Sequence, residues 1–204
     1  MIVIKRKKTI VEKLQHSLQG VFDISKELNT NILHNYKWRE MIQADLMKKI
    51  GLDIEEVSGI TGDDFKGKGV KKGEFKSITA YRDKVGTISK TRGAAEFDKM
   101  NDKIKREDFK KYDCACFTWF DETNPVASVL IKKKKAVEHF QKMGDEKIAD
   151  FFMLMEKNKK QGKRITRDSI RFTYKDVIKI TDAQYFSGHK EITLKEFKKL
   201  FGDV

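Results

Sequence analysis

Apolar residues recur at helical spacing over the first fifty positions of the chain. The first series consists of Ile10, Val11, Leu14, Leu18 and Val21. The second series consists of Trp38, Met41, Ile42, Leu46 and Ile50, and Gly51 follows it. Residues three and four apart lie on one face of a helix, and a glycine favours its end, so both series predict helices with one apolar side. The pattern predicts a helical N-terminal part over residues 8–50.

The pattern changes to short apolar runs between residues 52 and 131. Four runs predict strands, at residues 52–57, 74–79, 112–120 and 126–131. The last two are apolar on both faces, as central strands covered by helices are, and residues 121–125 between them predict a hairpin-like turn. Before these two strands, the spacing of Phe97, Met100 and Ile104 predicts a helix.

The pattern becomes helical again in the C-terminal part of the chain. A helical segment is expected to begin after Gly144. Its apolar side would consist of Ile148, Phe151, Phe152 and Met155. The sequence Thr193-Leu-Lys-Glu196 is a capping box, which predicts a final helix.

These elements together predict an α/β (α+β) protein with a mixed central β-sheet flanked by helices. A chain of 204 residues fits one domain and can bury a sizeable core. We therefore expect a single domain over residues 1–204. It would comprise a helical N-terminal part (8–50), a catalytic sheet core (52–131) and a helical C-terminal part (132–204).

The chain is strongly basic. Lysine and arginine number 44 against 31 acidic residues, which gives a net charge of +13. Enough aliphatic and aromatic residues remain for a packed interior, which a disordered basic tail lacks. The charge indicates a polyanionic partner, and nucleic acid is the first candidate because lysines displace the counterions condensed on phosphates.

Two features that would indicate other classes of protein are missing from the sequence. Residues 1–8 contain only four apolar side chains before a basic run, too few for a signal segment or a membrane span, so we expect a cytoplasmic protein without a membrane partner. Cys114 and Cys116 would share one face of a strand as buried thiols. Neither a CxxC pair nor a neighbouring histidine supports a zinc site.

The segment TGDDFKGKGVKKGEFKSIT, residues 61–79, places acids and lysines among glycines. An acid two positions before a lysine occurs in this chain about as often as chance predicts. Such tripeptides begin at Asp64, Glu74, Asp108, Asp145 and Glu196. Only Glu74-Phe75-Lys76 lies inside a strand-like run, where alternation points Glu74 and Lys76 to one face and Phe75 to the other.

Asp64 lies ten residues before Glu74 in the same segment. The glycines between them let the chain turn back, so a hairpin would set Asp64 beside Glu74 and Lys76. Two carboxylates and a backbone carbonyl, that of Phe75, suit Mg²⁺, which keeps positions for a phosphate oxygen and a water. The lysine would orient or help deprotonate that water, or stabilise the charge on the phosphate. The residues predict a hydrolytic phosphodiesterase site.

With Asp64, Glu74, Phe75 and Lys76 in this order, the sequence resembles the superfamily of PD-(D/E)XK nucleases, in particular type II restriction endonucleases. In that family the two acids and the lysine occupy adjoining strands, and a helix, two apolar strands and further helices follow. The resemblance covers residues 36–135, and the proline that names the family is absent before Asp64. It implies a DNA endonuclease with Asp64, Glu74 and Lys76 as catalytic residues, and Mg²⁺ held by Asp64, Glu74 and Phe75.

Several assignments in this segment have alternatives. Asp63 is an alternative first metal ligand, although its phase relative to Phe65 favours Asp64. Glu40 on the predicted second helix and Glu55 on the first strand are candidate supporting acids, with surface or capping roles as the default. The whole hairpin could also be a solvated loop whose charges only keep the protein soluble.

Two basic segments are candidate DNA-binding surfaces. The first, residues 87–93, directly follows the predicted catalytic strand, and the second covers residues 159–171. Arginine forks suit guanine edges and phosphates alike, but either segment could be a purely solvated face, as could the four lysines 132–135. The candidate DNA-binding residues are Lys90, Arg92, Lys163, Arg164, Arg167 and Arg171.

We therefore predict a Mg²⁺-dependent type II restriction endonuclease that acts on double-stranded DNA. The alternatives are a structure-selective repair nuclease or junction resolvase with the same site, and a non-catalytic nucleic-acid-binding protein. Each chain has one group of predicted catalytic residues, whereas both strands of a duplex must be cut. A homodimer is therefore expected, because it supplies two such groups and matches the two-fold symmetry of DNA. The N-terminal helices and residues 151–155 are its candidate contacts.

Overall fold

The computed structural model describes residues 17, 19–21, 23, 24, 26, 27, 37–56, 64–163 and 168–203. The chain divides into two compact units, residues 1–39 and 40–204. The described positions between 17 and 27 are helical, so the first predicted helix is confirmed at residues 17 and 19–21, and helical positions continue past Val21. The other helices are α2 (Lys37–Lys49), α3 (Lys103–Phe109), α4 (Lys134–Lys160), α5 (Tyr174–Val177) and α6 (Leu194–Leu200).

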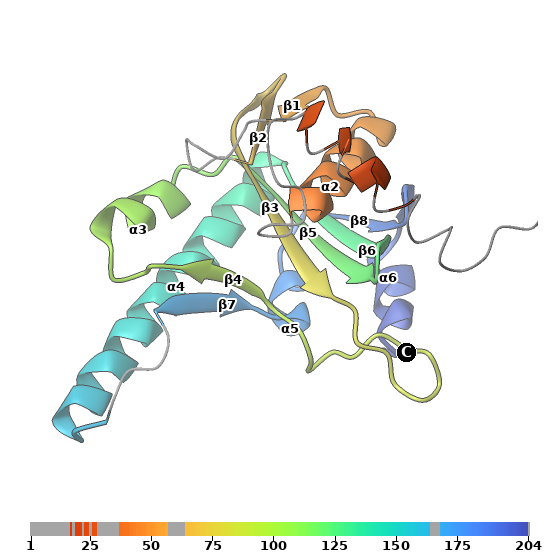
Figure 1. Ribbon diagram of the computed structural model, residues 1–204. Coiled ribbons are helices and arrows are strands. Elements are labelled where there is room, and N and C mark those ends of the chain that lie inside the picture. Colours follow the sequence, from red (N-terminus) through yellow and green to blue (C-terminus); the bar gives the residue numbers. More distant parts are fainter. Residues whose placement is uncertain are drawn as a thin grey trace, which may run out of the picture. The chain divides into compact units, whose positions relative to one another are not determined.

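Among the residues that the structure describes, seven strands form the central sheet, in the order β1-β2-β3-β5-β6-β8-β9 (Figure 1). They are β1 (Ile54–Glu56), β2 (Phe65–Gly67), β3 (Val70–Thr79), β5 (Cys114–Asp121), β6 (Asn124–Ile131), β8 (Gln184–Ser187) and β9 (Lys190–Ile192). The pair β3 and β5 is parallel and the other neighbours are antiparallel, so the sheet is mixed, as predicted. A separate antiparallel pair consists of β4 (Ala95–Asp98) and β7 (Ser169–Phe172).

The parallel strands β3 and β5 require a crossover connection, and β4 and α3 are part of it. The helix predicted from Phe97, Met100 and Ile104 is therefore wrong in extent. Phe97 lies in β4, where Ala95 and Phe97 are buried and alternate with more exposed neighbours, and α3 begins only after Met100. A strand, a turn and a helix in succession produced the spacing that indicated one helix.

Different elements cover the two faces of the central sheet (Figure 1). On one face, side chains of β5 such as Phe117 and Trp119 pack in a core that includes Phe140 of α4 and Phe197 of α6. On the other face, Phe75 of β3 belongs to a second core with residues of α2. Because β5 is covered on both sides, its sequence is apolar at nearly every position.

The two cysteines lie on the α2 face of β5 as buried free thiols, as predicted. Burial raises the pKa of the Cys114 thiol, and it raises the pKa of the Cys116 thiol to about 12. The thiolate is the reactive form of cysteine, so both side chains act as small apolar groups of the core.

The C-terminal part is not wholly helical, contrary to the prediction for residues 132–204. α4 is one continuous helix that includes Gly144. Glycine fits at this position because a Cβ there would stand 2.0 Å from the Phe109 ring. β7, β8 and β9 follow, and β8 and β9 extend the central sheet. α6 begins at the predicted capping box, where Thr193 Oγ1 donates to Glu196 Oε2 at 2.8 Å. Strands of three or four residues show too little periodicity to predict.

The four consecutive lysines at 132–135 connect β6 to the first turn of α4, and three of them are exposed. Lys134 Nζ lies 3.9 Å from Glu138 Oε1 on the next turn. This placement agrees with the solvated interpretation of the run. In the described part of the chain, none of the helices has the length and apolar character needed to cross a membrane.

Candidate active site

The β2–β3 hairpin brings Asp64 to β3, as the glycine-rich segment predicted. The Asp64 N–H donates to the Gly73 carbonyl at 3.0 Å, and Asp64 Oδ2 accepts a hydrogen bond from the Phe75 N–H at 2.7 Å. A Cβ at Gly73 would come within 2.4 Å of the Phe65 ring. Only glycine permits this approach, so Gly73 sets the spacing of the two strands beside Asp64.

Glu74 and Lys76 lie on the same face of β3, as alternation along the strand predicted. Lys76 Nζ is 2.5 Å from Glu74 Oε1, and both side chains line a cavity of about 270 Å³ together with Asp64. Phe75 points to the opposite face, where its ring stacks on Phe65 with centroids 4.3 Å apart. The three predicted catalytic side chains therefore converge on one cavity.

The crossover connection supplies the other walls of this cavity. They consist of Phe97, Asp98, Lys99, Met100, Lys105, Asp108, Phe109 and Tyr112. The parallel register pairs Gly73 with Cys114 and Glu74 with Ala115, so the residues just before β5 lie beside the acid-bearing part of β3. The cavity wall thus contains four carboxylates and three ammonium groups.

The charged form of the Asp64 carboxyl is destabilised in this environment. Its pKa is raised from 3.8 to about 7, first by burial and then by the negative charges of Glu74 and Glu40. The charge of Lys76 and the N–H of Phe75 act in the opposite direction. At neutral pH an approaching cation can displace the remaining proton, so Asp64 is suited to bind a metal ion.

Lys76 is held in its charged form by the acids around it. Burial acts to lower the pKa of Lys76, but the charge and hydrogen bond of Glu74 and the charges of Asp64 and Asp98 outweigh burial, and the pKa is raised. Its Nζ also lies 4.5 Å from the centroid of the Phe97 ring. As the protein stands, Lys76 is a proton donor and a positive charge, which suits stabilisation of a phosphate better than removal of a proton.

Tyr112 belongs to the site and was missed by the sequence analysis. Burial raises the pKa of its phenol, as do the charge of Glu74 and a hydrogen bond between the phenol and the Glu74 side chain. The Lys72 ammonium lies 5.3 Å from the centroid of its ring. The sequence predicts a strand at residues 112–120, which begins with Tyr112. Placing Tyr112 beside Glu74 also requires this strand to pair in parallel with β3.

Of the two candidate supporting acids, only Glu40 affects the site, through its influence on the Asp64 pKa. Glu55 on β1 is exposed and is not among the residues that line the cavity. Asp63 lies outside the described residues. The bond from the Phe75 N–H to the Asp64 carboxylate is the structural argument for Asp64 as first ligand.

The donor set of the cavity fits a hard cation such as Mg²⁺. Among the residues that the structure describes, no group of three or more His, Cys, Asp and Glu side chains is arranged as a metal site. The predicted set uses two carboxylates, Asp64 and Glu74, with the Phe75 carbonyl, and Mg²⁺ commonly completes such a set with waters. The negative charges of Glu74 and Glu40 add to burial in raising the pKa of Asp64, and a bound cation would offset these two charges.

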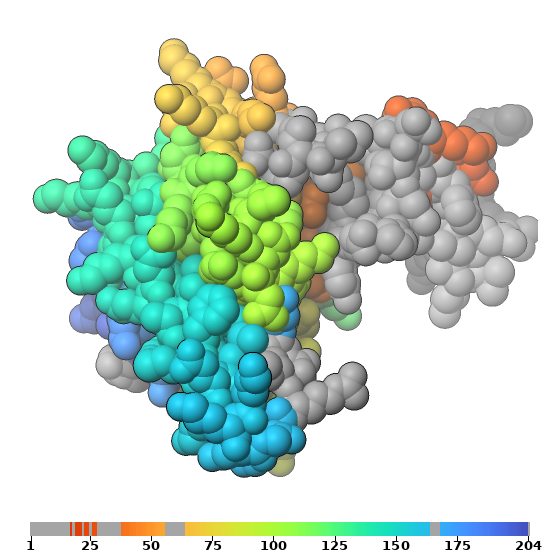
Figure 2. All heavy atoms as spheres, turned by 90° about the vertical axis from the view of Figure 1, so that its left-hand side faces the viewer, coloured from red at the N-terminus to blue at the C-terminus, as the bar shows by residue number. Residues whose placement is uncertain are grey.

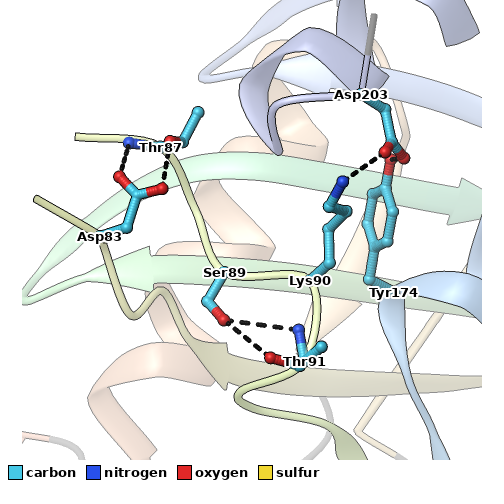
Figure 3. Close-up of polar contacts among 7 residues, drawn as sticks. All are labelled: Asp83, Thr87, Ser89, Lys90, Thr91, Tyr174 and Asp203. Atoms are coloured by element: carbon cyan, nitrogen blue, oxygen red, sulfur yellow. Dashed lines mark hydrogen bonds and ion pairs between the residues drawn. The ribbon is translucent and has the colours of Figure 1, made fainter. Parts of the chain in front are cut away.

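The candidate DNA-binding residues after β3 make contacts within the protein. Lys90 Nζ lies 2.5 Å from Asp203 Oδ1, and the Tyr174 hydroxyl donates to Asp203 Oδ2 at 2.6 Å (Figure 3). The Arg92 guanidinium lies 4.3 Å from the centroid of the Tyr81 ring. Neither Lys90 nor Arg92 lines the cavity, so the structure does not bring them to the acids.

The second basic segment is also separate from the cavity as far as it is described. Lys163 is exposed after the end of α4, and Arg164 and Arg167 lie outside the described residues. Arg171 on β7 pairs with Glu96 on β4, with Nε and Oε1 3.0 Å apart. The cations that do line the cavity beside Lys76 are two lysines of the crossover connection, which no motif in the sequence indicated.

Comparison of the chain with protein-family models, with curated proteins and with solved structures found no match in any of the three.

Proposed function

We propose that the protein is a Mg²⁺-dependent endonuclease that hydrolyses phosphodiester bonds in double-stranded DNA, and more narrowly a type II restriction endonuclease. The observation that supports this most is the convergence of Asp64, Glu74 and Lys76 on one cavity, with Lys76 paired to Glu74. An acid pair with a charged lysine is the combination that phosphodiester hydrolysis with a metal ion requires. The net charge of +13 supports a polyanionic substrate.

In this proposal the carboxylates of Asp64 and Glu74 and the Phe75 carbonyl hold the cation. When bound, Mg²⁺ supplies positive charge to a phosphate oxygen and lowers the pKa of a bound water. Lys76 donates to a phosphate oxygen and stabilises the negative charge that develops there. The Phe75 N–H fixes the orientation of the Asp64 carboxylate, and Lys76 pairs with that of Glu74.

A cleavage assay tests the proposal. The purified protein is incubated with long duplex DNA and with a synthetic four-way junction, with Mg²⁺ or with EDTA. Discrete duplex fragments that require Mg²⁺ support restriction, whereas cuts confined to the junction support the structure-selective nuclease. DNA that stays intact under all conditions but binds the protein contradicts catalysis and supports the non-catalytic alternative.

We also propose that the enzyme acts as a homodimer. The described part of the chain contains one such acid–lysine cavity, and two strands must be cut. Met153 and Leu154, 62% and 56% exposed on α4, are candidate contacts within the predicted stretch 151–155. Analytical ultracentrifugation with and without duplex DNA is expected to give two chains per duplex. One chain per duplex, with both strands cut, would exclude the dimer and indicate sequential nicking by a monomer.

A further inference from the structure

We propose that Lys99 and Lys105 form a phosphate clamp that holds the DNA backbone over the acid-lined cavity. This inference rests on the proposed nuclease function and names two substrate-binding residues for it. Lys99 lies in the turn after β4 and Lys105 in α3, and both line the cavity that contains Asp64 and Glu74. α3, light green in Figure 2, forms part of the molecular surface next to α4.

The need for such a clamp follows from the charges of the cavity wall. Asp64, Glu74, Asp98 and Asp108 all line it, so a phosphodiester that enters meets four carboxylates. Lys76 neutralises part of this charge but lies 2.5 Å from Glu74. Further cations at the cavity are therefore required to attract a polyanion.

Lys99 and Lys105 are the lysines of this wall that remain available. Neighbouring lysines are already paired with acids: Lys72 Nζ lies 3.3 Å from Asp108, and Lys103 Nζ lies 3.8 Å from Glu107. Neither Lys99 nor Lys105 has an acidic side-chain partner among the residues that the structure describes. An ammonium group without a partner can displace counterions from a phosphate without first breaking an ion pair.

The backbone at Lys99 indicates a fixed position rather than a loose loop. Lys99 has φ +60°, in the left-handed region that favours glycine. The turn is held by Asp168, whose Oδ1 accepts from the Asn101 N–H at 2.7 Å, and by Arg106, whose Nη1 donates to the Met100 carbonyl. Strain of this kind persists when the surroundings determine the conformation, and it is concentrated at functional sites.

The test measures binding of a 30-base-pair duplex of mixed sequence in EDTA, over about 50 to 200 mM KCl. The variants are Lys99→Gly, Lys105→Ala and the double variant, and Lys103→Ala is the control on the same helix. Each lost phosphate contact reduces the slope of log K against log salt by about 0.9 and weakens binding roughly eightfold at 0.1 M salt. The double variant is expected to lose about twice as much in slope, and Lys103→Ala to behave as wild type.

Lys99→Gly separates binding from folding, because glycine suits the observed φ while removing the ammonium. Its melting temperature should equal or exceed that of wild type while its DNA affinity falls. Lys105→Arg should keep the slope of wild type. An unchanged slope in the double variant, or an equal loss in Lys103→Ala, overturns the clamp even if the wild type cuts DNA with Mg²⁺. A wild type that neither binds nor cuts DNA overturns the clamp and the nuclease together.

Discussion

Two groups in this protein contain the same three side chains, a carboxylate, a lysine and a tyrosine, and they differ in the state of their acids. In the group of Figure 3, Asp203 accepts from Lys90 and Tyr174, and these hydrogen bonds lower the pKa of Asp203. In the cavity, Glu74 interacts with Lys76 and Tyr112, but a second acid lies beside it. The pKa of that second acid, Asp64, is raised to about 7.

The two groups differ in the balance of charge and in burial. Asp203 accepts hydrogen bonds from two donors at the surface, and the charge of Lys90 balances that of Asp203. These bonds link the residues at the C-terminal end of α6 to the loop that contains Lys90. In the cavity four carboxylates face three ammonium groups, and Glu74 is buried there. Like charges beside a partly desolvated acid such as Asp64 are costly for folding, and they are typical of a site that binds a charged ligand.

The largest expected effect comes from removing the acid of each group in turn. Glu74→Gln should lower Mg²⁺-dependent DNA cleavage by about 10³-fold or more, because the metal set and the partner of Lys76 are lost together. Binding of duplex DNA in EDTA should survive. Asp203→Asn should leave the cleavage rate within about twofold. Equal rates for Glu74→Gln and wild type, measured with excess Mg²⁺, would contradict the site assignment.

The second prediction concerns how the free energy of unfolding depends on pH. The folded protein binds a proton at Asp64 more tightly than the unfolded chain does, so the free energy of unfolding should fall as pH rises from about 4 to about 7. Asp64→Asn removes this loss and should stabilise the protein at pH 8 by up to about 4 kcal/mol. Chemical denaturation at pH 5 and pH 8 measures the difference.

The same measurement has a control of opposite sign. The lowered pKa of Asp203 contributes stability at pH 8 that is lost as pH falls through that pKa, so Asp203→Asn should destabilise the protein at pH 8.

Added Mg²⁺ should raise the melting temperature of wild type at pH 8 and not that of Asp64→Asn. If Mg²⁺ stabilises both proteins equally, Asp64 is not a ligand.

The smallest expected effect is at the tyrosines. Tyr112→Phe removes the phenol hydroxyl that interacts with Glu74 and should lower cleavage about tenfold, since residues that orient metal ligands commonly contribute 10- to 100-fold. The loss should be smaller at high Mg²⁺, because the apparent affinity for the ion falls. Tyr174→Phe, the matched change in the other group, should alter thermal stability without altering the Mg²⁺ dependence. Equal losses at all Mg²⁺ concentrations would indicate that Tyr112 is only structural.

The parts of the site that depend on local geometry could be predicted from the sequence. The phase of Glu74 and Lys76 follows from alternation along one strand, and the approach of Asp64 follows from a hairpin with Gly73 at its closest point. The mixed sheet was also predictable, because the apolar sequence of β5 requires cover on both faces.

The parts that could not be predicted depend on long-range packing. Tyr112 reaches Glu74 only because β3 and β5 are parallel, and no local pattern specifies that pairing. Phe97 lies in a strand because its partner, β7, is supplied from far along the chain. Lys99 and Lys105 look like any surface lysines in the sequence, and the turn held by Asp168 is what distinguishes Lys99.

The β2–β3 hairpin has a consequence for the order of folding. Asp64 and Phe75 are separated by 11 positions, whereas Asp113, next to Tyr112, bonds to Lys71 across 42 positions. Hairpins form within about 1–10 μs, and contacts across a long connection form later. The acids should therefore meet before the crossover buries them. Since burial is the main cause of the raised pKa of Asp64, that pKa should stay ordinary in the early hairpin, and proton uptake by Asp64 near pH 6 should report the closing of the cavity.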